Sequence, residues 1–201
     1  MASYLFVFLN SREDQLANFA DLDLNVTHRL YLDSAAEEGI DLKHRYANVY
    51  RLKDFPSSSI PQIETYLDSL GTSKLHTIHW RIYTTLAETS KLQLSAPTIV
   101  TVEMTIPTDP ASHDELDRWY SEEHIPALAT VPGWQAAARM KLVHASTRNT
   151  APYLALHEWA GPNELGGEIW KRAILTPGTK RVEGMQTAPM ERRVWTLDHD
   201  H

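Results

Sequence analysis

Residues 153–159 read YLALHEW, and residues 46–52 in the other half of the chain read YANVYRL, with a similar alternation of side chains. Three more pairs of segments recur in the same order: LFVFLN at 5–10 with VTVEMT at 100–105, VTHRLYL at 26–32 with AAARMKL at 136–142, and HWRIYTTL at 79–86 with ERRVWTLD at 191–198. One such match is weak evidence, but four matches in the same order indicate an internal repeat. Their alternating patterns are typical of β-strands.

Helical patterns occupy equivalent gaps between these strands. In the second half, Ser112 and Glu115 form a predicted capping box before an apolar helical face. The members of that face are Leu116, Trp119, Tyr120 and His124. In the first half, Ser59 and Pro61 open a predicted helix that Gly71 ends. Each half therefore reads strand, helix, strand, strand, helix, strand, which is the ferredoxin-like βαββαβ unit. The predicted fold class is α+β, with two ferredoxin-like repeats in one chain packing sheet to sheet as a pseudo-dimeric α/β barrel.

Composition narrows the classes of partner. With 42% hydrophobic and 22% charged residues, the chain is predicted to fold. A net charge of −7 and a pI of about 5.8 argue against a nucleic acid or an anionic membrane as partner. The chain has no cysteine, which excludes disulfides and thiolate chemistry and suits a reducing compartment, so we expect a cytoplasmic protein. The apolar run near the N-terminus lacks a basic leader and is too short to span a bilayer, so it predicts a strand.

The sequence motifs point to no cofactor. A glycine-rich phosphate loop and a G-x-S-x-G elbow are both absent from the sequence. The histidines lack the spacings of zinc sites, and the DHDH tail at 198–201 is terminal and has no supporting ligands. His124 or His157 could serve as a proximal heme ligand, but the sequence offers no second indicator. We therefore predict neither a metal nor a cofactor.

The alternation along the strands predicts which side chains line the barrel. If the apolar positions face the helices, the polar and aromatic positions face inward. The inward set is then Glu103, Arg139, Tyr153, His157 and Trp159 from the second half, with Phe8, Arg29, Tyr31, Tyr46, Tyr50 and Arg81 or Tyr83 from the first. With the opposite assignment, Glu158 replaces His157. An aromatic interior with a few ionisable groups suits a hydrophobic, oxygenated small molecule.

The segment WYSEEHIPALATVPGW at 119–134, followed by YLALHEW and closed by ERRVWTL, resembles the EthD-like branch of the dimeric α/β-barrel superfamily, particularly its fungal two-repeat members. The resemblance is strong over 97–198 and weak over 1–90. Between Asn10 and Val26 the first half has no W-Y-x-x-x-H-I-P segment, and its first helix is expected to be short.

This resemblance sets the expected domain organisation. Residues 1–91 form a degenerate first repeat, 92–96 a linker, and 97–201 an EthD-like second repeat that carries the site. Since a fused pseudo-dimer closes its own barrel, a further homodimer is compatible with this organisation but not required by it.

Two histidines are the candidate acid-base groups. Pro126 predicts that the helix ends near His124, where the helix dipole would favour the cationic imidazole. An imidazole that titrates near neutrality can act as general acid or base, although His124 could also simply cap the helix. His157 lies in the middle of a predicted strand, either as a second acid-base group or as a satisfied core residue.

Arg139 and Arg29 occupy equivalent repeat positions, and Glu103 is the predicted partner of Arg139. This pair is either structural or places Arg139 against a substrate carboxylate or a developing enolate. The catalytic candidates are thus His124, His157, Arg139 and Glu103. The substrate-binding candidates are Tyr153, Trp159, Tyr120, Trp134, Arg29 and Tyr50.

The resemblance implies a range of chemistries, because the superfamily includes cofactor-free monooxygenases, polyketide cyclases, decarboxylases, dehydratases and heme enzymes. We expect a cofactor-independent lyase or cyclase that carries out acid-base chemistry beside a carbonyl of a hydrophobic natural-product intermediate, such as a polyketide. One alternative is cofactor-free oxygenation of an aromatic phenol. Another is a small-molecule-binding or stress-associated barrel without turnover. Fold alone does not choose between them.

Overall fold

The computed structural model describes residues 2–10, 24–34, 44–71 and 79–198. Eight antiparallel strands close into a barrel in the order β1-β3-β2-β8-β5-β7-β6-β4. The strands are β1 (Ser3–Leu9), β2 (Val26–Ser34), β3 (Tyr46–Leu52), β4 (His79–Glu88), β5 (Thr98–Met104), β6 (Trp134–Ala145), β7 (Tyr153–Trp159) and β8 (Glu191–Leu197). All eight predicted strand segments are confirmed.

The barrel consists of two equivalent four-stranded sheets. The first has the order β4-β1-β3-β2 and the second has the order β8-β5-β7-β6, so corresponding strands occupy corresponding places. The sheets join where β2 pairs with β8 and where β4 pairs with β6, both antiparallel. The predicted fold class, two ferredoxin-like repeats forming a pseudo-dimeric α+β barrel, is confirmed.

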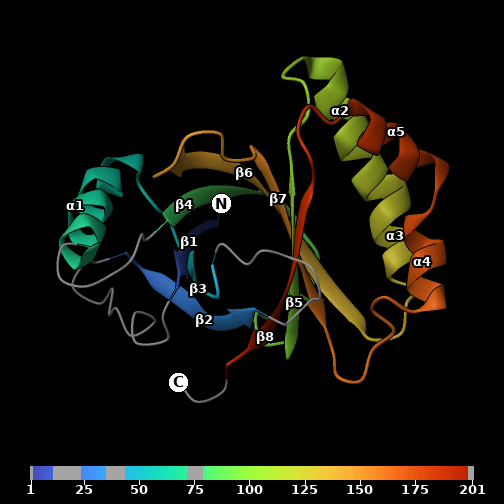
Figure 1. The fold of residues 1–201 in the computed structure, drawn as a ribbon, viewed down its shortest axis with the longest axis horizontal. Coiled ribbons are helices and arrows are strands. Elements are labelled where there is room, and N and C mark those ends of the chain that lie inside the picture. The colour runs from blue at the N-terminus through green and yellow to red at the C-terminus, as the bar shows by residue number, and fades with distance from the viewer. Residues whose placement is uncertain (1, 11–23, 35–43, 72–78, 199–201) are drawn as a thin grey trace.

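Helices cover the outer faces of the sheets (Figure 1). The short η3 (Ser57–Ser59) leads into α1 (Ile60–Gly71), which covers the first sheet and matches the predicted helix. A layer of helices stands over the second sheet. Its members are α2 (Pro110–Arg118), η4 (Trp119–His124), α3 (Ile125–Leu128), α4 (Glu168–Ile174) and α5 (Pro177–Met185). None of the helices in the described part of the chain is both long and apolar enough to cross a membrane.

The start of α2 differs from the predicted capping box. The cap is Asp109, whose side chain accepts the backbone N–H of Ser112 at 3.0 Å and its hydroxyl at 2.7 Å. Pro110 then occupies the first helical position, where its missing N–H costs nothing. Ser112 therefore lies inside the first turn, where its own N–H is capped by Asp109, and it does not act as the cap.

The helix also continues past His124, so the prediction that it ends there is wrong. Residues 119–124 form a π-helical turn, in which the N–H of Ile125 bonds to the carbonyl of Tyr120, five residues earlier. A turn of this width relieves the clash that the Pro126 ring would make with the preceding turn of an α-helix. The chain then resumes as α3.

The barrel interior is an apolar core, and part of the predicted face assignment is wrong. Ala138 and Met140 of β6 and Leu154 and Leu156 of β7 point inward, not toward the helices. The reason is that the helix layer buries the outer face as well, so alternation no longer distinguishes the two faces. The assignment is correct for a smaller set: Phe8, Arg81, Tyr83 and Glu103 lie inside.

The remaining residues predicted to face inward lie on the outer side of the barrel. On the second sheet, Arg139, Tyr153, His157 and Trp159 face the helix layer. On the first sheet, the outward residues are Arg29, Tyr31, Tyr46 and Tyr50.

Glu158 faces the barrel end, as the opposite face assignment predicted. Its carboxylate accepts three backbone N–H groups, from Gln93 at 2.9 Å, Ser95 at 2.9 Å and Ala96 at 3.3 Å. Leu94 and Ala96 belong to the barrel core, so the segment 92–96 lies against the barrel interior.

Candidate active site

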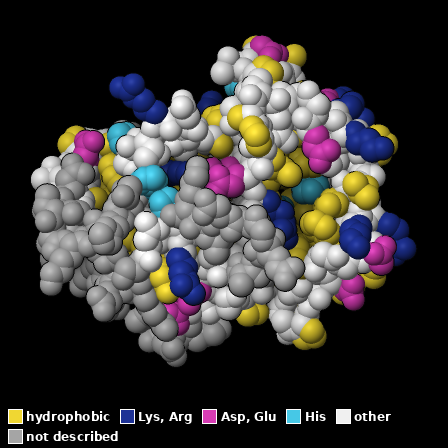
Figure 2. All heavy atoms as spheres, viewed as in Figure 1, with side chains coloured by type: hydrophobic (Ala, Val, Ile, Leu, Met, Phe, Trp, Pro, Cys, Tyr) yellow, Lys and Arg dark blue, Asp and Glu magenta, His cyan; other side chains and the backbone are white. Residues whose placement is uncertain are grey.

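A cavity of about 140 Å³ lies between the outer face of the second sheet and its helix layer. An engineered cavity of similar size takes up a benzene ring. Figure 2 shows hydrophobic side chains around a hollow in which a histidine is visible. The lining residues are Val100, Val102, Met104, Trp119, Tyr120, His124, Leu128, His157, Trp159, Leu165, Trp170, Ile174, Thr179, Val182, Glu183, Gln186, Met190 and Arg192.

The π-helical turn brings the aromatic groups of the site together. The rings of Trp119 and His124 stack with centroids 4.2 Å apart and an interplanar angle of 27°. The Tyr120 ring meets the His124 ring edge-on at 5.4 Å. Because an extra residue in the turn changes which side chains share a face, this stack depends on the π geometry.

The two candidate histidines face each other across the helix–sheet boundary. Their ring centroids are 6.0 Å apart and their planes are nearly perpendicular, at 83°. Desolvation lowers the pKa of His124 to about 4. Desolvation, followed by the nearby His124 and Arg192, lowers the pKa of His157 to about 3. Both imidazoles are therefore neutral at neutral pH, and the expectation of a cationic His124 is wrong because burial outweighs the helix dipole.

His157 is held by a neighbour on β6. The indole Nε1–H of Trp134 donates a hydrogen bond to His157 Nδ1 at 3.3 Å. Trp134, predicted to bind substrate, is not one of the residues that line the cavity. It contacts the site through His157.

Several buried polar atoms of cavity residues have no hydrogen-bond partner among the described residues. They are Trp119 Nε1, His124 Nδ1, Trp159 Nε1 and Gln186 Oε1. Two of these are indole N–H donors and one is an amide acceptor. Buried polar atoms usually have partners, so their grouping here fits a ligand that brings oxygen atoms into an apolar site.

A tryptophan and an arginine extend the cavity lining on α4 and β8. The Arg192 guanidinium lies 5.4 Å from the centroid of the Trp170 ring. Neither residue was a predicted site residue. Arg192 alternates with Arg193 on β8, and a reliable face assignment for that strand would have identified it.

Glu123 fixes the π turn to the start of α5. Its Oε1 accepts the backbone N–H of Gly178 at 2.9 Å. The Thr176 hydroxyl, the Gly178 N–H and the Arg181 guanidinium hold the pKa of Glu123 below its usual range. A carboxylate is favoured at a helix N-terminus, so this contact positions His124, the next residue along the chain.

Three predicted catalytic or binding residues lie beside the cavity or in the barrel. Arg139 pairs with Asp117, and its guanidinium lies 4.3 Å from the centroid of Tyr120. Glu103 pairs with Arg81 inside the barrel at 2.5 Å, so the predicted Arg139–Glu103 pair is wrong. Tyr153 packs near α2, with its ring 5.6 Å from that of His113.

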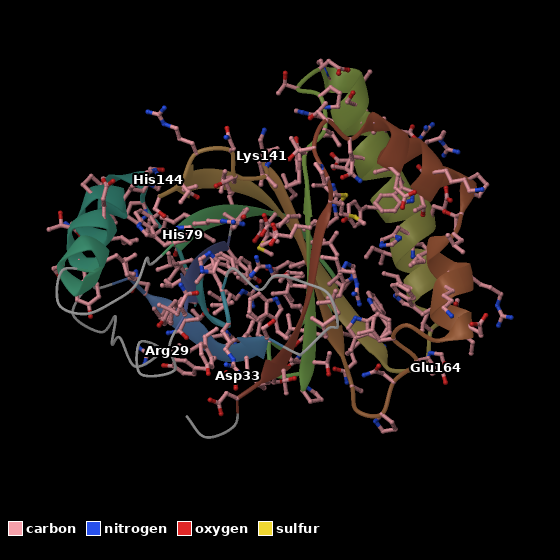
Figure 3. The ribbon with its side chains drawn as sticks, viewed as in Figure 1. Arg29, Asp33, His79, Lys141, His144 and Glu164 are labelled. Carbon is pink, nitrogen blue, oxygen red and sulfur yellow. The ribbon has the colours of Figure 1, made fainter. Side chains whose placement is uncertain are left out.

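The first-half candidates lie far from this cavity. Figure 3 places Arg29 on the side of the barrel away from α2–α5, where its side chain is exposed. Tyr50 is buried in the apolar cluster beneath α1, and its hydroxyl accepts a hydrogen bond from Asn48. Neither contributes to the site of the second half.

A metal site would need a cluster of ligating side chains. Within the described ranges, no group of three or more His, Asp or Glu side chains could hold a metal ion.

The sequence matches no protein-family model, and no curated protein matches it. Solved structures do match over nearly the whole chain. An anthrone oxidase-like protein has a TM-score of 0.62 at 14% identity, with 98% of this chain and 91% of that chain covered. A monooxygenase-like protein from Listeria innocua has a TM-score of 0.54 at 11% identity, covering 99% and 95%. A heme-degrading enzyme from Listeria monocytogenes has a TM-score of 0.52 at 10% identity, covering 98% and 100%. These similarities show the fold.

Proposed function

We propose that the protein is a small-molecule enzyme whose reaction takes place in the cavity between the second sheet and its helices. The observation that carries this proposal is the pair of neutral, buried imidazoles beside unpartnered indole N–H groups in a largely apolar cavity. An apolar, largely buried cavity with a few convergent polar groups is the usual form of a small-molecule site.

The reaction that fits these groups is proton transfer beside a carbonyl. One imidazole takes a proton from carbon, while N–H donors stabilise the negative charge that develops on oxygen. The indole donors of Trp119 and Trp159 are suited to this second role, because they carry no charge and have no protein acceptor among the described residues. Arg139, Tyr153 and Glu103, which lie outside the cavity lining, have no direct part in this proposal.

The substrate class follows from the lining. The cavity takes in at least one aromatic ring, and the unpartnered polar atoms favour a ring that carries oxygen. This supports cyclisation, dehydration or decarboxylation of an oxygenated aromatic intermediate of the polyketide kind, the chemistry implied by the EthD-like resemblance. The neighbour described as anthrone oxidase-like supports a polycyclic aromatic ketone as the first probe.

Cofactor-free oxygenation is the second candidate. A base in a dry cavity would generate the phenolate or enolate that such enzymes pass to oxygen, and one neighbour is described as monooxygenase-like. The two reactions share their first step and differ in whether oxygen is consumed.

Anthrone tests both candidates, because loss of one CH2 proton converts it to an aromatic enolate. We expect the protein to accelerate deuterium exchange at this carbon under nitrogen, and His124→Gln or His157→Gln to reduce the exchange about 100-fold. Oxygen uptake with formation of anthraquinone would favour the oxygenase instead. If the wild type binds anthrone without exchange or oxygen uptake, and both variants bind it with the same affinity, the protein is a small-molecule-binding protein and the enzyme proposal is contradicted.

A further inference from the structure

The hydrogen bond between Trp134 and His157 distinguishes the two ring nitrogens of this histidine. An indole N–H is a donor only, so the nitrogen that it contacts must be an acceptor. The contact is Trp134 Nε1 to His157 Nδ1, at 3.3 Å. With the proton on Nδ1 instead, two N–H groups would face each other in a buried site.

The imidazole of His157 is neutral, because burial lowers its pKa to about 3, so it carries a single proton. The groups that face it are His124 on η4 and Arg192 on β8, and neither offers a carboxylate that would favour the cation. The proton that Nδ1 cannot hold must then be on Nε2. Since His157 lines the cavity and Trp134 occupies Nδ1, Nε2 is the nitrogen left to meet a ligand.

We infer that Trp134 is a positioning residue that holds His157 in the Nε2–H form, so that this histidine presents a hydrogen-bond donor to the ligand in the cavity. The inference rests on the proposed function and divides the roles within it. His157 becomes the donor to the substrate oxygen, and His124 becomes the group that accepts the proton from carbon. In the balanced step, the substrate C–H bond breaks, its proton passes to His124, and its electron pair moves onto the oxygen that His157 hydrogen-bonds.

The neighbouring strand provides a matched control. Trp159 pairs with Trp134 across β6 and β7, and its indole nitrogen has no partner among the described residues. Trp159→Phe removes an indole from the same site without removing the bond to Nδ1. Trp134→Phe removes that bond and keeps an aromatic ring.

The test is long-range 1H–15N NMR of the whole protein labelled at histidine nitrogen, without ligand. Among the ten histidines, His157 is assigned by the signals that disappear in His157→Gln. We expect wild type and Trp159→Phe to show His157 with an unprotonated Nδ1 and a protonated Nε2. Trp134→Phe should show a shift of both nitrogens toward the average of the two tautomers.

A protonated Nδ1 of His157 in the wild type would overturn the inference, and the only variant that this measurement needs is the His157→Gln protein used for assignment. An unchanged His157 spectrum in a folded Trp134→Phe protein would overturn it as well. With anthrone, Trp134→Phe should lower kcat about twofold with little change in KM, because only about half of the His157 side chains then carry the Nε2 proton that donates to the transition state. If His124→Gln and His157→Gln both exchange anthrone normally while the tautomer is as expected, the proposed function fails and the Trp134 contact stands.

Discussion

The outer face of the first sheet is packed with apolar side chains beneath α1, whereas the outer face of the second sheet carries His157, which faces His124 of the helix layer across a cavity. The strand position occupied by His157 in β7 corresponds to Tyr50 in β3, as the repeat alignment gives it. Tyr50 lies in a cluster with Trp80 and Ile63, and its hydroxyl accepts a hydrogen bond from Asn48. His157 instead meets a second histidine across a cavity.

The two sheets have the same strand order, so the sheet alone does not create the site. The helices differ. Over the second sheet a π-helical turn inserts Trp119 and His124 as a stacked pair, and Glu123 anchors this turn to α5. A repeat fold thus acquires a site by changing the layer that covers it, while the barrel core stays closed.

The largest expected effect is the loss of turnover in the cavity histidines. His124→Gln and His157→Gln should each lower anthrone exchange about 100-fold. The matched control is His144→Gln, since His144 stacks on Trp80 at 4.7 Å and lies on the side of α1 (Figure 3). Equal losses in all three variants would remove the distinction between the two outer faces.

Acid should destabilise the protein through its buried histidines. The folded pKa of His124, about 4, lies below its ordinary value of 6.5, so the unfolded chain binds more protons between these values. Stability is therefore full above about pH 6.5 and falls as the pH is lowered. We expect His124 to account for a loss of about 2 kcal/mol in the free energy of unfolding between about pH 6.5 and about pH 5.

The measurement is urea unfolding at several pH values in the wild type and in His124→Gln. The variant should show a shallower fall, with the remainder contributed by His157 and by His44, whose pKa burial also lowers to about 4. Identical slopes in the two proteins would show that His124 does not titrate in a buried site.

Gly178→Ala should destabilise the helix layer by about 1 to 2 kcal/mol, because the added methyl group would collide with the Glu123 carboxylate. Gly184→Ala is the control on the same helix, since no atom lies within 4 Å of its added carbon. That change should be neutral or stabilise by about 0.5 kcal/mol. Thermal unfolding of both variants makes the comparison, and a destabilised Gly184→Ala would show that glycine in α5 matters for another reason.

The smallest effect concerns the charge beside Trp170. Arg192→Gln should weaken binding of 1-naphthoate about threefold and leave the neutral 1-naphthylmethanol unchanged, because the guanidinium is partly exposed and screened. Isothermal titration of both ligands distinguishes a charge effect from a packing effect. Equal weakening of both would assign Arg192 to packing on Trp170.

The architecture could be predicted because the four strand segments repeat in the same order in both halves, and chain connectivity then permits few sheets. The strand faces could not, because Leu154 and Leu156 are as buried inside the barrel as His157 is outside it. His124 was identified, but the helix was expected to end there, because a π turn has no sequence signature. Its imidazole was also expected to be cationic, because the helix-dipole argument ignores desolvation. The Trp134 contact depends on pairing between β6 and β7, which the sequence of either strand alone does not specify.

Glu158 ties the segment between the two repeats to β7 through three backbone N–H groups. The segment 92–96 supplies Leu94 and Ala96 to the barrel core, so the connection between the repeats closes one end of the barrel. Cutting the chain within this segment would therefore do more than separate the two repeats. It would also remove Leu94 and Ala96 from the barrel core and open that end of the barrel. Two consecutive residues of β7 contact the cavity and the connecting segment: the His157 side chain lines the cavity, and the Glu158 carboxylate binds segment 92–96. The connection between the two repeats and the position of His157 therefore depend on neighbouring residues of one strand.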